Sequence, residues 1–182
     1  MYKVLPQPRS CPASLPTELA EFYARHVPCS EHEVPNLNLE LFDIDRLQAV
    51  SGSSFESLRE LLDAYPEYEH WRPVRGWRVG TTDFGEPLLY LQRDPAIGCE
   101  GVYAIGGSVA GPQESIRQPH WLLRLARTME EWNARLRADR GIDYGIVPGE
   151  IRDLPWHRRM RLRRHFKVLN PDLGAMWSRP KR

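Results

Sequence analysis

The sequence predicts a small α+β domain with antiparallel strands, on three observations. Apolar residues recur at helical spacing in the N-terminal third, strand-forming segments follow one another between residues 71 and 105, and an amphipathic segment comes after them. The connections between the middle segments are too short for parallel crossovers, which need a dozen residues or more. At 182 residues, the chain is long enough for one domain with a substantial core and an appendage.

The chain is expected to begin with an arm and a helix. Residues 1–14 carry three prolines and show no periodicity, which predicts a lead-in arm. Residues 15–26 have Pro16 in the first turn of the expected helix, and Pro28 ends it. The residues that fall on one helical face are Leu15, Leu19, Phe22, Tyr23 and His26.

A short strand and a second helix are expected next. Leucines alternate with polar residues over 37–41, which is typical of a half-buried strand, and residues 43–47 turn into a short helical piece. Ser53 and Glu56 have the spacing of a capping box, so they predict the start of an amphipathic helix over residues 55–65.

The middle of the chain is expected to form the sheet. Residues 71–105 are rich in Trp, Val, Tyr and Leu, with breaks at Gly76, Gly80, Gly85 and the loop 94–98. Because these connections are short, the segment predicts three or four antiparallel strands.

The C-terminal part is expected to contain two helices. Residues 121–137 show the strongest helical pattern in the chain, and this helix should cover one face of the sheet. Its apolar stripe consists of Leu122, Leu125, Met129, Trp132 and Leu136. A glycine-rich linker over 139–150 then leads to a basic helix over 155–167. We therefore expect an arm (1–14), a domain (15–140) and a basic, helical extension (141–182).

Composition favours a cytoplasmic protein. No apolar run approaches the roughly 20 residues needed to cross a bilayer, and the first residues lack the apolar core of a signal peptide. The three cysteines, Cys11, Cys29 and Cys99, are an odd number without close pairs, so reduced thiols are expected.

Charge is distributed unevenly along the chain. Residues 16–70 contain 12 acidic and three basic side chains, whereas residues 151–182 contain 10 basic and two acidic ones. The segment between them holds 10 of each. Two surfaces of opposite sign are therefore expected, and such surfaces favour charge-steered association.

Motifs for catalysis or cofactors are weak. His26, Cys29 and His32 have a spacing that a metal could use, but Pro28 breaks the chain between them and no fourth ligand is near. The tripeptide 83–85 resembles the magnesium-binding motif of kinases without its companion motifs, and the glycines after residue 105 lack the lysine of a P-loop. We expect no catalytic residue, no cofactor and no metal.

The basic C-terminal segment leaves two interpretations open. Its cations could contact nucleic-acid phosphates: Arg158, Arg159, Arg161, Arg163, Arg164 and Lys167. Alternatively, the helix docks on its own domain, which its apolar residues favour: Trp156, Met160, Leu162, Phe166 and Leu169.

Several motifs together resemble the SUKH superfamily, which joins fungal cell-wall-synthesis regulators to bacterial immunity proteins against polymorphic toxins. The first is a Leu-Pro-x-x-Leu-x-x-Phe-Tyr helix that starts at Leu15. An Asp-Phe-Gly turn at Asp83 then leads into an apolar strand, a Gly-Val-Tyr strand starts at Gly101, and a helix with an aromatic residue closes the unit. The resemblance covers about residues 15–136. The Glu86-Pro87 continuation and the segment after residue 139 depart from the family pattern.

The resemblance implies a curved antiparallel sheet with flanking helices, no enzymatic activity, and stoichiometric binding of a cognate toxin domain, many of which are nucleases. Charge and expected exposure indicate the toxin contacts Glu31, Glu33, Glu67, Tyr68, Glu69 and Trp71. The alternatives are a nucleic-acid-binding accessory protein that uses the basic segment, and an enzyme whose site comes from scattered residues.

Overall fold

The computed structural model describes residues 1–30, 33, 39–64, 66–82, 85–106, 121–138 and 155–171. The elements, in chain order, are β1 (Tyr2–Val4), α1 (Thr17–Arg25), β2 (His26–Pro28), β3 (Leu39–Leu41), the 3₁₀ turn η1 (Ile44–Arg46), β4 (Gln48–Ser51), α2 (Glu56–Ala64), the 3₁₀ turn η2 (Pro66–Trp71), β5 (Arg75–Thr82), β6 (Pro87–Asp94), β7 (Cys99–Gly106), β8 (Trp121–Ala126), α3 (Met129–Ala138) and α4 (Trp156–Leu169). The predicted α+β class is confirmed.

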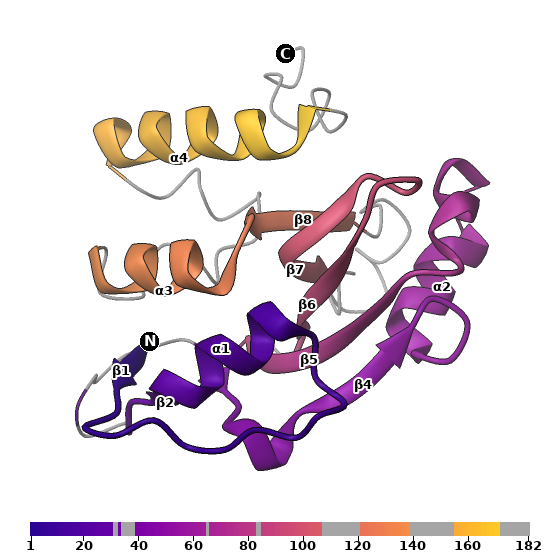
Figure 1. Cartoon of the computed structure of the whole chain (residues 1–182). Helices are drawn as coiled ribbons and strands as arrows, with labels where there is room; N and C mark the ends of the chain where they lie inside the picture. Colours follow the sequence, from indigo (N-terminus) through magenta and orange to yellow (C-terminus); the bar gives the residue numbers. More distant parts are fainter. Residues whose placement is uncertain are drawn as a thin grey trace.

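One six-stranded antiparallel sheet organises the molecule, in the order β3-β5-β6-β7-β8, and β4 also pairs with β5 (Figure 1). Strands β3 and β4 lie against different halves of β5, with Leu39 opposite Thr82 and Gln48 opposite Arg78. The turn η1 separates them, so this edge of the sheet is one interrupted strand. Of the strand predicted over 37–41, residues 39–41 are described and form β3. The short helical piece and the antiparallel strands of the middle segment are confirmed.

Both faces of the sheet are buried, which explains the nearly continuous apolar sequence of β6 and β7. In β6, Leu88 and Tyr90 face a core formed with α1 and α3, whereas Leu89 and Leu91 face a second core formed with α2. Strand β7 alternates in the same way from Val102 to Ile105. Helices α1 and α2 therefore cover opposite faces of the sheet.

The first residues of the chain belong to the folded core. Tyr2 is fully buried, and its hydroxyl lies 3.0 Å from the Tyr23 hydroxyl. Its backbone N–H donates to Asn133 Oδ1 at 2.8 Å, and β1 pairs with β2. The sequence suggested only a lead-in arm here, because a three-residue strand is too short to show a period.

The helix expected over residues 121–137 is wrong in its first half, where the structure has strand β8. Leu122 faces the core under α2, while Leu123 and Leu125 face the core under α1 and α3. The helix begins only at Met129, after Thr128, whose Oγ1 accepts the Glu131 N–H at 3.0 Å. A short apolar run fits both the helical period and a strand buried on two faces. The burial of both faces of this segment makes it a strand.

The capping box predicted for α2 is also wrong. The helix begins at Glu56, so this residue takes the first helical position instead of the third. The Ser53 hydroxyl lies 3.2 Å from the hydroxyl of Ser51. The helices expected over 15–26 and 55–65 are otherwise confirmed. Residues 83 and 84 and the expected linker 139–150 lie outside the described part of the chain.

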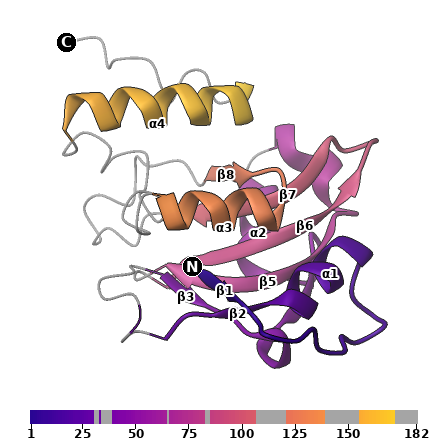
Figure 2. The ribbon, with the colours of Figure 1, turned by 60° about the vertical axis from the view of Figure 1, so that its left-hand side comes forward.

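The basic C-terminal helix exists and docks on the sheet. Helix α4 lies beside β8 and α3 in both ribbon views (Figures 1 and 2). Phe166 is fully buried in the core, and His165 Nε2 lies 3.1 Å from the carbonyl oxygen of Leu125. The Asn170 side chain accepts the Arg124 N–H at 2.7 Å and donates to the Arg124 carbonyl at 3.0 Å. These contacts cover the free edge of β8.

Candidate partner-binding site

Glu33, one of the expected toxin contacts, already has hydrogen-bond partners within the chain. Its carboxylate accepts Lys3 Nζ at 2.6 Å and the Ser30 N–H at 2.8 Å. These hydrogen bonds, the one from Lys3 first, lower the pKa of Glu33 to about 2. Glu31, the expected contact beside it, lies outside the described residues.

The expected toxin contacts in η2 differ in how far they are already occupied by other residues of the chain. Glu69 pairs with Arg72 at 2.5 Å, and Arg72 also pairs with Asp63 at 2.8 Å. Trp71 is half-buried and meets the Tyr103 ring edge-on, with 5.7 Å between ring centroids, so much of its surface serves the core. Glu67 and Tyr68 belong to η2, but their side chains are not among those described.

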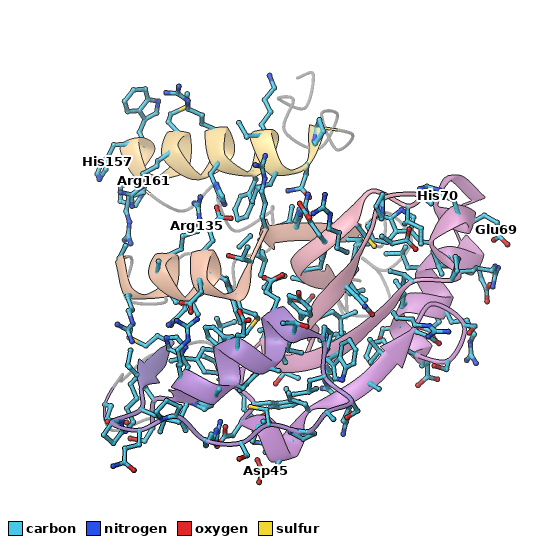
Figure 3. The ribbon with its side chains drawn as sticks, viewed as in Figure 1. Asp45, Glu69, His70, Arg135, His157 and Arg161 are labelled. Carbon is cyan, nitrogen blue, oxygen red and sulfur yellow. The ribbon has the colours of Figure 1, made fainter. Side chains whose placement is uncertain are left out.

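The structure does not bring the expected contacts together. Glu33 binds Lys3 of β1, at one end of the molecule. Figure 3 shows Glu69 and His70 at the opposite end, beyond α2. A single partner surface therefore cannot centre on both, and the sequence had grouped them by charge alone.

A groove between α1 and α3 is a better candidate. It encloses about 310 Å³ and is lined by Glu18, Glu21, Phe22, Arg25, Thr128, Met129 and Glu130. Phe22 and Met129 are almost wholly buried and supply its apolar side. Three carboxylates against one guanidinium give the rim a negative formal charge.

Each carboxylate of the groove is held differently. Glu18 Oε2 accepts the hydroxyl of Tyr90 at 2.8 Å. Burial, together with this hydrogen bond, raises the pKa of Tyr90, so the phenol remains a donor at neutral pH. Glu130 pairs with Arg25 at 3.1 Å, and its other oxygen lies 3.8 Å from His26 Nε2. Glu21 is exposed.

This arrangement suits a cationic side chain with an apolar stem. Lysine and arginine bury their methylene stems on apolar surface while their charged ends remain at a polar rim. The exposed carboxylate of Glu21 and the oriented one of Glu18 provide acceptors for such a group. The sequence shows both glutamates on the polar side of α1, but their proximity to α3 depends on the tertiary fold.

A second recess, of about 710 Å³, opens near the end of β2. Its charged lining residues already have partners: Lys3 pairs with Glu33, Asp43 with Arg9, and Arg46 with Glu40. A charged partner would have to displace these pairs, so this recess is the weaker candidate.

The three-residue spacing of His26, Cys29 and His32 does not produce a metal site in the described structure. The His26 ring stacks on Phe22, with 4.4 Å between centroids, and its Nδ1 lies 2.9 Å from the Phe22 carbonyl oxygen. His32 is outside the described residues. Within the described ranges, no three or more His, Cys, Asp or Glu side chains gather as a metal would require.

Comparison with known proteins finds no matching family model, no matching curated protein and no matching solved structure. Of the helices in the described ranges, none has the length and apolar character needed to span a membrane.

Proposed function

We propose that this chain is a SUKH-like immunity protein, which binds a cognate bacterial toxin domain in the cytoplasm and neutralises it by stoichiometric occlusion. The α+β fold and the motif order noted above support the proposal. The observation that carries it is the groove between α1 and α3, which joins an apolar side to a rim of three carboxylates.

Charge and packing contribute in different ways to such binding. Many toxins of this class are nucleases with basic active sites, so an acidic inhibitor accelerates encounter through complementary charge. A cationic side chain whose stem enters the groove would add desolvated contact, which carries most of the affinity at interfaces. Neither step requires a reaction by this chain.

The first test is a rescue assay with the toxin domain encoded beside this gene. Cells that express this toxin should survive with the wild-type chain and lose at least tenfold in survival with the double variant E18Q/E21Q. The substitution preserves side-chain shape and removes two negative charges from the groove rim. Circular dichroism of the purified variant controls for folding.

A matched variant distinguishes the groove from the contacts expected from sequence. E67Q/E69Q removes two negative charges from η2, at the other side of the molecule, and should protect as the wild type does. Loss of protection only in E67Q/E69Q would move the interface to η2. Full protection by both variants, or the absence of a toxin gene nearby, would contradict the proposal.

A further inference from the structure

The inner face of helix α4 packs against the rest of the domain. Phe166 is fully buried and Leu169 is 8% exposed, and His165 and Asn170 contact the backbone of β8. These contacts fix the rotation of the helix about its axis. The residues on the other side are therefore presented outward as a defined surface.

The outer face carries cations and exposed apolar groups. Its cations are His157, Arg164 and Lys167, all exposed, although His157 is charged only when protonated. Trp156 is 69% exposed, Met160 47% and Val168 64%. The helix contains no acidic residue. Figure 3 shows His157 at the end of the molecule opposite Glu69, whereas Arg161 lies below α4, on the side toward α3.

We propose that the outer face of α4 binds single-stranded nucleic acid. The cations stand seven and three residues apart, that is, about two turns and one turn, so they line one side of the helix. From His157 to Lys167 the row extends for about 15 Å, which accommodates about four phosphates of one strand. The exposed ring of Trp156, at the start of the row, offers a surface on which a base stacks. The proposal does not depend on the proposed immunity function.

The arrangement favours nucleic acid over an anionic membrane. An interfacial helix needs a continuous apolar strip to insert between lipids. On α4, Arg164 lies between Met160 and Val168 at four-residue steps, so the apolar residues do not form such a strip. An acidic protein partner would offer carboxylates, but it has neither evenly spaced phosphates nor flat bases that stack on Trp156.

Binding of the full chain to a labelled oligothymidylate or oligouridylate of about 12 nucleotides tests the proposal. Fluorescence anisotropy should give a Kd in the micromolar range at low salt. The logarithm of the association constant should fall with the logarithm of salt concentration at a slope of about −1.4, since two phosphates are neutralised at neutral pH.

Two variants separate the contributions. R164Q/K167Q should remove nearly the whole salt slope, because both phosphate contacts are lost. W156A should weaken binding by roughly 5- to 150-fold with the slope unchanged, because stacking is lost and charge is retained. The control R59Q/R93Q removes two exposed cations from other elements and should bind as the wild type does.

Several results would overturn the proposal. No oligonucleotide binding at low salt is the first, and equal binding by R164Q/K167Q and the wild type is the second. Binding that survives W156A undiminished would make the surface a general polyanion site. Binding to phosphatidylserine vesicles without binding to either oligonucleotide would assign the face to a membrane.

Discussion

At the residue scale, polar side chains take the place of a neighbouring strand at one edge of the sheet that the structure describes. Asn170 is 7% exposed, and its amide binds both the N–H and the carbonyl oxygen of Arg124 in β8. It also donates to the Phe166 carbonyl at 3.0 Å. One side chain therefore satisfies the open edge of the sheet and the end of α4 together.

Asn170→Ala should lower the free energy of unfolding by about 2–6 kcal/mol. The change leaves the N–H and the carbonyl of Arg124 without their partner, and each unsatisfied buried group costs about 1–3 kcal/mol. Urea denaturation measures the difference. Val168→Ala, at an exposed position of the same helix, should change the value by less than about 0.5 kcal/mol. Equal stability of N170A and the wild type would contradict the assigned role.

At the element scale, α4 protects an edge that would otherwise be open to other strands. Among the described strands, β8 is the last one at its side of the sheet, and unpaired strand edges favour aggregation unless they are covered. The contact between α4 and β8 also includes a titratable side chain, because the ring of His165 in α4 lies against the Leu125 carbonyl oxygen in β8. Burial lowers the pKa of His165, and the nearby charges of Arg135 and Glu131 act on it in opposite directions.

The docking of α4 should therefore weaken in mild acid. The pKa of folded His165 lies below its value of 6.5 in the unfolded chain. Below that value the unfolded state binds a proton that the folded state does not, so stability falls as the pH decreases through and below about 6.5. Above it, both states are neutral and the effect disappears.

Thermal unfolding at about pH 7.5 and about pH 5.5 measures this contribution. The melting temperature of the wild type should fall more between these values than that of His165→Gln, which keeps a hydrogen-bond donor and does not titrate. An identical fall in both proteins would assign the pH dependence to other groups.

At the scale of the whole molecule, the sequence predicted most elements and few of their relationships. The helical period of α1 and the short connections of the middle strands are local signals, and both predictions are confirmed. Strand β8 was misassigned because its burial on two faces depends on neighbours far along the chain.

The candidate site was harder to predict than the fold. Glu18 and Glu130 stand more than 100 residues apart in sequence, and only the packing of α1 beside α3 places them around one groove. Charge counts placed acids in the N-terminal third. They could not show that Glu33, bound to Lys3 of β1, lies at a different end of the molecule from Glu69. Tyr2 gave no local signal, although it is fully buried.

Isothermal titration of the purified toxin domain with this chain tests the central claim most directly. The account predicts a one-to-one complex whose affinity decreases with added salt, and at least tenfold weaker binding by E18Q/E21Q than by E67Q/E69Q. Absence of a complex, or a complex of equal affinity with E18Q/E21Q and the wild type, would contradict it.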